Sequence, residues 1–323
     1  MISTKLTRRF DLQYPVIQAP MAFAAGGELA AAVANAGGMG LIGGAYGDAQ
    51  WLDEQFSLAG DTQVGCGFIT WSLAKNLALL DHVLEKKPGA LFLSFGDPAP
   101  FVQVIKSAGV ALICQVQTLR DAQHAIGVGA DVIVAQGSEA GGHGEKRGTL
   151  TLVPEVADFI SRENADVMLC AAGGIADGRG LAASLMLGAD GVVMGSRFWA
   201  THEAQVHPNM LQAAIDANGD DTIRSSVMDI ARRLNWPDRY TARVLKNAFT
   251  DQWHDDLPAL LKNQDDEADR WRKAWVAGDI TTANTFVGEV AGLIDSIESA
   301  ADVLRDTCTE AKALLSEHSK GLN

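Results

Sequence analysis

Short apolar runs alternate with amphipathic or alanine-rich stretches along the first 200 residues of the chain. Eight runs are short and apolar at almost every position, a pattern typical of strands that are covered on both faces. These predicted strands are residues 16–19, 39–43, 63–69, 90–95, 110–116, 131–135, 167–172 and 191–194. The stretches between them carry helical apolar spacing, at residues 27–36, 48–59, 73–85, 98–108, 119–127, 154–162 and 178–187. This alternation predicts an α/β fold, specifically a (β/α)₈ TIM barrel.

The pattern changes in the C-terminal third, where charged residues become denser. Residues 218–279 read as helical and contain four tryptophans, Trp236, Trp253, Trp271 and Trp275. Residues 294–317 repeat apolar positions at helical spacing, which predicts a helix packed on the barrel. We therefore expect a barrel formed by residues 1–204 and 284–323, with residues 205–283 inserted as a helical cap.

The net charge of −14 argues against a nucleic-acid partner, because such binding depends on clustered Lys and Arg, and no basic run is present. No apolar segment is long enough to suggest a membrane span, and the N-terminus lacks the apolar region of a secretory signal. The four cysteines, Cys66, Cys114, Cys170 and Cys308, have no metal-ligand spacing. We expect free thiols, no bound metal and a cytoplasmic location.

One glycine motif is misleading. Gly38, Gly40 and Gly43 match the G-x-G-x-x-G pattern of dinucleotide-binding folds. That pattern requires a strand before it and a helix after it, whereas here a predicted helix precedes and a predicted strand follows. A dinucleotide site at this position is therefore not expected.

A glycine-dense segment follows the sixth predicted strand. Residues 137–144 contain four glycines and a single histidine, His143. Glycines permit a backbone to approach a ligand closely, and histidine titrates near neutral pH. An ordinary loop with a solvated histidine is the alternative interpretation of this segment.

Two further turns lie after the seventh and eighth predicted strands. Gly173 and Gly174 end one strand, and Met194, Gly195 and Ser196 end the next and open a helix. In TIM barrels the loops after these two strands often form a phosphate site from backbone N–H groups. Two routine strand-to-helix turns are the alternative, but their order on consecutive strands favours phosphate.

The chain resembles the nitronate monooxygenase family, formerly called 2-nitropropane dioxygenases. The resemblance covers nearly the whole chain and is carried by residues 17–21 (IQAPM), 135–143 (AQGSEAGGH), 171–175 (AAGGI), 194–198 (MGSRF), 242–249 (ARVLKNAF) and 287–294 (VGEVAGLI). The motifs in this order are specific. The EAGGH piece alone is shared with flavin-dependent enoyl-acyl-carrier reductases and NADH:quinone reductases.

The resemblance implies an FMN cofactor held by the barrel. The family's flavin contacts correspond here to Ala19, Pro20, Met21, Gln136, Gly141, Gly142, Gly173, Gly174, Met194, Gly195 and Ser196. The chain departs from the family pattern at strand three, where Gly65-Cys66-Gly67-Phe68 replaces a Gly-Val-Asn segment. After strand five, where relatives often carry a polar or basic residue, the candidate is Gln115.

His143 corresponds to the family's catalytic histidine. A nitroalkane carries an acidic C–H beside its nitro group, and a base with a pKa near neutrality removes such a proton efficiently. We expect Glu139 to fix the loop by accepting hydrogen bonds, and Lys146 and Arg147 to be solvated surface charges. The implied reaction oxidises an alkyl nitronate with O₂ to a carbonyl compound and nitrite.

Three alternatives remain at this point. The first is an NAD(P)H-dependent flavin reductase acting on a quinone or an enoyl thioester, which needs no separate nicotinamide motif. The second is a flavin- or phosphate-binding protein without turnover, and the third is a phosphosugar isomerase or synthase on the same barrel. The tryptophans of the insertion suit an interface as well as a core, so a homodimer stays open.

Overall fold

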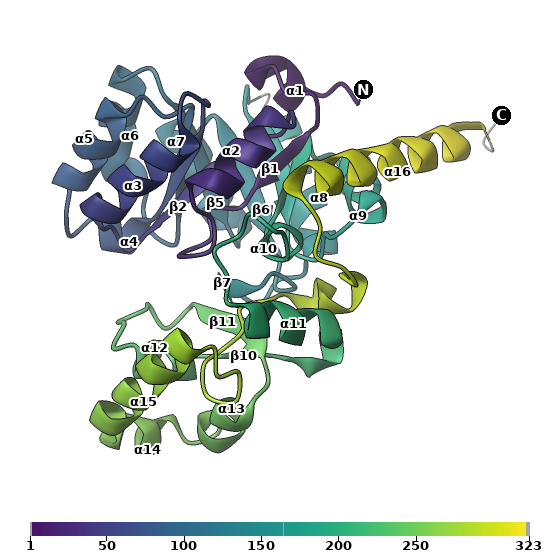
Figure 1. The fold of residues 1–323 in the computed structure, drawn as a ribbon. Helices are drawn as coiled ribbons and strands as arrows, with labels where there is room; N and C mark the ends of the chain where they lie inside the picture. Colours follow the sequence, from purple (N-terminus) through teal and green to yellow (C-terminus); the bar gives the residue numbers. More distant parts are fainter. Residues whose placement is uncertain (1, 164, 321–323) are drawn as a thin grey trace.

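Eight parallel strands form the predicted barrel in a computed structural model that describes residues 2–163 and 165–320 (Figure 1). The strands are β1 (Val16–Gln18), β2 (Leu41–Ala45), β3 (Gly65–Ile69), β4 (Ala90–Ser94), β5 (Ala111–Val116), β6 (Val132–Gln136), β8 (Met168–Ala172) and β9 (Gly191–Met194). Their order in the sheet is β1-β9-β8-β6-β5-β4-β3-β2. A parallel bridge between Ile17 and Met39 links the two end strands. All eight strand predictions are confirmed.

The helices surround the sheet with bounds that differ in places from the predicted ones. They are α1 (Lys5–Phe10), α2 (Gly27–Asn35), α3 (Ala49–Ala59), α4 (Thr70–Leu73), α5 (Ala78–Glu85), α6 (Ala99–Ser107), α7 (Leu119–Val128), α8 (Thr149–Arg162), α9 (Gly178–Met186) and α10 (Ser196–Trp199). Helix α1 was not predicted, and the single helix expected at 73–85 is two helices. Helix α8 begins five residues before Pro154, so the proline lies inside the helix and not at its start, where the sequence placed it.

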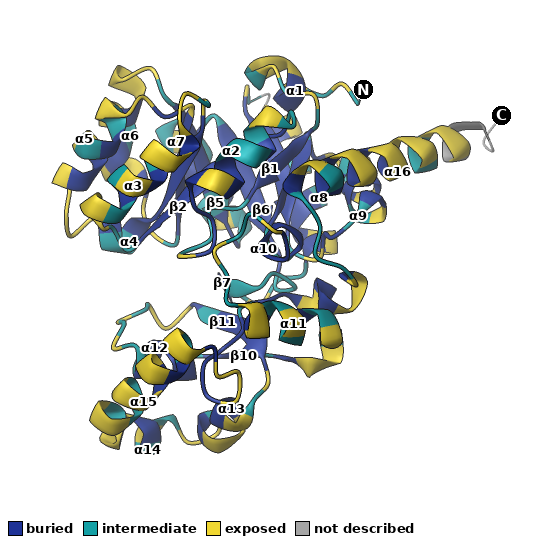
Figure 2. Cartoon of the chain, viewed as in Figure 1, coloured by how far each residue is buried: buried dark blue, intermediate teal, exposed yellow. Residues whose placement is uncertain are grey.

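The apolar side chains form two layers, one inside the barrel and one between strands and helices. Ile17, Phe92 and Ile113 belong to the inner layer, and Ile42, Leu91 and Leu112 belong to the outer one. Neighbouring residues of one strand point to opposite layers, and both layers are apolar. This arrangement explains why the strands read as continuous apolar runs, and Figure 2 shows them as the most buried part of the molecule.

The G-x-G-x-x-G segment has a packing role. It lies between α2 and β2, so a helix precedes it and a strand follows it. A Cβ on Gly40 would lie 1.8 Å from the carbonyl oxygen of Ala30. Glycine is needed there because helix and strand backbones touch.

The C-terminal helix α16 (Ala300–Lys320) packs along the outside of the barrel and extends away from it (Figure 1). It begins six residues later than predicted, because the chain before it is not helical and Glu298 forms a parallel bridge with Thr201. No helix of the described residues is long and apolar enough to cross a membrane. All four cysteines are buried and free, and burial raises the pKa of Cys66 and Cys114 to about 12, so these thiols are unreactive at neutral pH.

The inserted region is not wholly helical, which corrects the prediction. It contains α11 (Pro208–Asp216), β10 (Thr222–Ser225), α12 (Val227–Ala231), β11 (Thr241–Leu245), α13 (Ala248–Trp253), α14 (Leu257–Lys262) and α15 (Gln264–Ala277). We call these elements the cap. Strands β10 and β11 form an antiparallel sheet with a third strand, β7 (Gly142–Gly144), that comes from the barrel side of the chain. The cap has its own apolar cluster, which includes Val244, Phe249 and Trp271.

Candidate functional site

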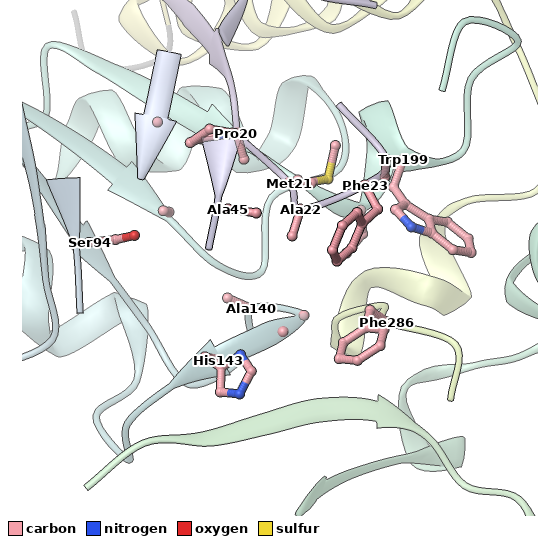
Figure 3. A pocket seen from close by; sticks show the side chains of 18 of the residues that line it. Pro20, Met21, Ala22, Phe23, Ala45, Ser94, Ala140, His143, Trp199 and Phe286 are labelled. Carbon is pink, nitrogen blue, oxygen red and sulfur yellow. The ribbon is translucent and has the colours of Figure 1, made fainter. Parts of the chain in front are cut away.

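A cavity of about 320 Å³ lies at the carboxyl ends of the barrel strands, beneath the cap. Its volume is within the range of small-molecule sites. Among the residues that line it are the following predicted site residues: Ala19, Pro20, Met21, Gln115, Gln136, Gly141, Gly142, His143, Gly173, Gly174, Gly195 and Ser196. Figure 3 shows Met21, Ala22 and Ala45 on one side of this space, with His143 and Phe286 on the opposite side.

Met194 is the predicted site residue that does not line the cavity. Its side chain is buried in the layer between strands and helices, and the neighbouring Val193 lines the cavity instead. The difference follows from strand alternation, since successive side chains point to opposite faces. The Met194 carbonyl still contributes to the site, because it accepts a hydrogen bond from the N–H of Ala19 at 3.0 Å.

The turns after β8 and β9 leave backbone donors free. Gly173 and Gly174 have φ values of +92° and +76°, which glycine adopts without strain. None of the hydrogen bonds between described residues uses the N–H of Gly173, Gly174 or Gly195. Gly173, Gly174 and Gly195 all line the cavity, so these turns border open space. Free N–H groups around an open space suit an anion such as a phosphate.

Ser196 adds a hydroxyl beside these turns. It is the first residue of α10, a helix of only four residues. Its Oγ accepts a hydrogen bond of 2.9 Å from the N–H of Gly288, which leaves its own O–H to donate. The segment at Gly288, which follows the cap in the chain, therefore orients Ser196.

The turn after β1 lies across the mouth of the barrel. The N–H of Met21 donates to the carbonyl of Ala19 at 2.8 Å, so Pro20 stands at the corner of a tight turn. A Cβ on Gly67 would lie 2.3 Å from Pro20, and one on Gly43 would lie 2.2 Å from the carbonyl oxygen of Met21. Pro20 therefore fills the space that any side chain at position 67 of strand three would need.

Amide side chains link the ends of β5 and β6 to the histidine. Nε2 of Gln115 and Nε2 of Gln117 donate to Oε1 of Gln136 at 3.1 and 2.8 Å. Nε2 of Gln136 donates in turn to the carbonyl of His143 at 3.1 Å. Gln115 and Gln136 both line the cavity, so they offer polar contacts to a ligand from the barrel floor.

The histidine segment is not a free loop, as the sequence suggested, but contains strand β7. Residues of β7 pair with β11, and His143 lies opposite Ala242. Gly141 is needed because a Cβ there would lie 2.6 Å from the N–H nitrogen of Gly288. The sequence missed β7 because its sheet partner lies almost 100 residues away along the chain.

Glu139 fixes this segment to the barrel, as predicted. Its carboxylate accepts hydrogen bonds from the backbone N–H and the hydroxyl of Thr149, at the start of α8. A carboxylate is favourable at a helix N-terminus. Arg147 forms an ion pair with Glu155 and does not reach into the cavity, which agrees with its predicted role as a surface charge.

Two arginines of the cap sheet hold the same segment from the other side. Nη1 of Arg224 on β10 and Nε of Arg243 on β11 both donate to the carbonyl of Ser138, at 3.2 and 3.0 Å. Burial, assisted by the neighbouring Arg243, lowers the pKa of Arg224 to about 10. The histidine segment is therefore fastened to barrel and cap together.

His143 is buried and has a charged partner from the cap. Its Nε2 lies 2.9 Å from Oδ2 of Asp229, and the two side chains are only 8% and 4% exposed. Burial lowers the pKa of His143 below its ordinary 6.5, although the hydrogen bond from the imidazole to Asp229 acts in the opposite direction. The imidazole is therefore neutral at neutral pH.

Aromatic and cationic groups complete the surroundings of His143. The indole of Trp236 stacks on the imidazole with centroids 3.4 Å apart and planes inclined by 5°. Arg232 donates to Oδ1 of Asp229 at 3.0 Å. The hydroxyl of Tyr46, after β2, accepts from Trp236 at 3.1 Å and so connects the barrel to the cap.

The sequence analysis did not identify Asp229, Arg232 or Tyr46 as site residues. It noted Trp236 only as one of the tryptophans of the insertion. The single local signal was an acidic and a basic residue three positions apart, a spacing found on many helix surfaces. Asp229 and His143 lie 86 residues apart, so only the folded chain brings them together.

Apolar side chains line much of the rest of the cavity. Met210 and Trp275 come from the cap, Phe23 follows β1, Trp199 ends α10, and Phe286 follows the cap in the chain. The described residues include no group of three or more His, Cys, Asp or Glu side chains that could hold a metal ion. The polar groups of the cavity therefore include the buried imidazole of His143 and the half-buried imidazole of His207, together with free backbone N–H groups and amides beside an apolar wall.

The chain is similar to known proteins over most of its length. The family model described as nitronate monooxygenase matches residues 3–59 and 69–310. The chain is 32% identical to a nitronate monooxygenase of Neurospora crassa, over 92% of this chain and 89% of that protein. It is 33% identical to the nitronate monooxygenase npaC of Metarhizium robertsii, over 93% and 91% of the two chains.

Two solved structures are similar over almost their whole length. FabK from Thermotoga maritima superimposes with a TM-score of 0.87 at 30% identity, and all of both chains is covered. A nitroalkane oxidase from Streptomyces ansochromogenes gives a TM-score of 0.79 at 25% identity, covering 95% of this chain and 99% of that one.

Proposed function

Because the chain belongs to the nitronate monooxygenase family, we propose that this oxidoreductase uses FMN to oxidise alkyl nitronates with O₂. The products are a carbonyl compound and nitrite. His143 acts as the base when the substrate is offered as the neutral nitroalkane. The observation that carries the proposal is a single cavity that joins free backbone donors, amide side chains and one buried imidazole.

The residues present fit FMN. The free N–H groups of Gly173, Gly174 and Gly195, with the hydroxyl of Ser196, would hold the phosphate. The turn at Pro20 and the amides of Gln115 and Gln136 would hold the ring system. When bound, FMN supplies the electron acceptor that amino-acid side chains lack.

The protein's own contribution to the reaction is a proton acceptor. Nε2 of His143 forms a hydrogen bond with Asp229, and no hydrogen bond between described residues uses Nδ1. A neutral imidazole with one free nitrogen is suited to removing the proton beside a nitro group, a step in which a positioned base contributes about 10²- to 10⁴-fold. A nitronate has already lost that proton and needs only to be bound.

The test is a direct assay on the purified, flavin-loaded protein. Nitronate and O₂ are supplied, and oxygen uptake and nitrite are measured. We expect both to appear in proportion to the protein. A protein with full flavin occupancy and no nitrite production would rule out the proposal.

An NAD(P)H-dependent flavin reductase acting on a quinone or an enoyl thioester is the second candidate. Two observations favour it: the EAGGH sequence around His143 is shared with such reductases, and the superposition on FabK is closer than that on the nitroalkane oxidase. NADH is added without oxygen and the flavin absorbance is followed. Rapid bleaching by NADH, with none by nitronate, would support the reductase instead.

A further inference from the structure

The cap places a carboxylate beside His143, the base of the proposed reaction. Asp229 lies on α12, and its Oδ2 is 2.9 Å from Nε2 of His143. Its other oxygen, Oδ1, accepts from Arg232 at 3.0 Å. The Asp229 side chain is only 4% exposed, so its charge is balanced by Arg232 and not by water, while the neutral imidazole of His143 adds a hydrogen bond.

This contact determines which nitrogen of His143 carries the proton. An ionised carboxylate can only accept hydrogen bonds, so Nε2 must be the donor. In a neutral imidazole the other nitrogen, Nδ1, then holds the free lone pair. No hydrogen bond between described residues uses Nδ1, and His143 lines the cavity.

The orientation of the ring is fixed by neighbours on both sides of the site. Trp236 stacks on it at 3.4 Å, and the ring of Phe95 approaches it edge-on with centroids 6.1 Å apart. Tyr46 holds Trp236 through a hydrogen bond of 3.1 Å. These contacts hold the imidazole of His143 in one orientation.

We propose that Asp229 is the positioning residue for His143, holding the Nε2–H tautomer so that Nδ1 faces the substrate as the proton acceptor. This inference rests on the proposed role of His143 as a base. In the step, the C–H bond of the nitroalkane breaks and an Nδ1–H bond forms. The electron pair stays on the substrate, which becomes the nitronate, and Asp229 stabilises the imidazolium that results.

The inference also gives the cap a part in the chemistry. Asp229 and Trp236 belong to the cap, whereas the predicted flavin contacts come from the barrel rim and the histidine segment. The other titratable and charged groups that surround His143 are Tyr46, Arg224, Arg232 and Tyr240. Arg224 and Arg232 oppose protonation of the imidazole, and Asp229 is the group that favours it.

The test compares Asp229→Asn with the wild type by two independent measurements. Asparagine has nearly the same size but no charge, and its amide can donate to Nε2, which permits the other tautomer. ¹⁵N NMR of the imidazole nitrogens, assigned with His143→Gln, reports the tautomer without any turnover. We expect the Nε2–H form in the wild type and its partial or full loss in Asp229→Asn.

The second measurement is kcat/KM on a neutral nitroalkane and on its nitronate. We expect Asp229→Asn to lose about 10- to 10³-fold on the nitroalkane, less than removal of the base itself costs, and to keep the nitronate rate within a few-fold. Asp265→Asn, at an exposed cap carboxylate paired with Arg233, is the matched control and should change neither rate.

The outcomes separate this inference from the proposed function. A wild type that turns over neither substrate refutes the nitronate monooxygenase proposal, while the NMR result still decides the role of Asp229. An Nδ1–H tautomer in the wild type would overturn the inference, even if the variant failed to fold. Equal losses on nitroalkane and nitronate would also overturn it, because they would show a purely structural role.

Discussion

The barrel rim, meaning the turns at the carboxyl ends of the barrel strands, and the cap line the same cavity but offer different chemical groups. The rim offers backbone N–H groups at Gly173, Gly174 and Gly195 and the amides of two glutamines. The cap offers aromatic rings and one buried ion pair, Asp229 with Arg232. The rim is suited to hold a cofactor, whereas the cap orients the base. The two regions should therefore respond differently to substitution, and the following predictions examine that difference.

The largest effect is expected where the two regions meet, at His143. His143→Ala removes the proton acceptor, so kcat/KM for a neutral nitroalkane should fall by about 10²- to 10⁴-fold. Turnover of the nitronate should fall much less, because that substrate needs no deprotonation. Steady-state assays with both substrates measure this, and equal losses on the two would contradict a role as base.

A cap variant, Asp229→Asn, should shift the pH dependence as well as the rate. Burial lowers the pKa of His143, so the nitroalkane activity of the wild type should fall only below pH 6.5, as the imidazole gains a proton. Asp229 is the neighbour that raises this pKa, so its replacement should move the acidic limb to still lower pH. A pH profile of kcat/KM checks the sign, and an acidic limb moved to higher pH would refute the account.

A rim variant, Gly174→Ala, should weaken flavin binding and leave the histidine unchanged. Its φ of +76° strains an alanine, and the added Cβ would lie 3.4 Å from Cβ of Glu139, so the turn that offers the N–H groups has to shift. We expect about 10-fold weaker flavin affinity, which corresponds to roughly 1.4 kcal/mol. Gly60→Ala is the matched control, since Gly60 has a φ of +61° and no atom within 4 Å of the added Cβ. Flavin titration by fluorescence distinguishes the two, and equal affinities would place the phosphate elsewhere.

The smallest effect is expected from Trp236→Leu. Stacked aromatic pairs contribute about 0.5–1.5 kcal/mol, so a looser imidazole should cost about 2- to 10-fold in nitroalkane kcat/KM. Flavin affinity should not change, because Trp236 belongs to the cap. A loss of flavin together with activity would show that the cap also holds the cofactor.

The same two regions differ in how well the sequence predicts them. The barrel strands are buried on both faces and are therefore apolar at almost every position. A run such as residues 111–116 can be recognised as a strand without knowing which strands lie beside it. The glycine turns at Gly173 and Gly195 are equally local, because their function depends on backbone conformation. For Met194, which the resemblance matches to a flavin contact, strand alternation sends the side chain away from the cavity.

The sheet of β10, β11 and β7 could not be predicted in this way, although the sequence does predict the insertion. Its strands are short, and β7 has the sequence Gly-His-Gly, which carries no alternation of apolar and polar residues. Its pairing with β11 and the contact between Asp229 and His143 join residues far apart in the chain. Such contacts depend on the folded topology, and a single sequence contains no local pattern that reveals them.

The most direct test of the central claim, that a cap carboxylate holds the base above a flavin kept by the rim, is anaerobic reduction of the flavin. Stopped-flow absorbance follows its bleaching in the wild type and in Asp229→Asn, with a neutral nitroalkane and with its nitronate. The account predicts that the variant slows bleaching by the nitroalkane at least about 10-fold and leaves bleaching by the nitronate nearly unchanged. Bleaching that is equally fast in both proteins with the nitroalkane would contradict it.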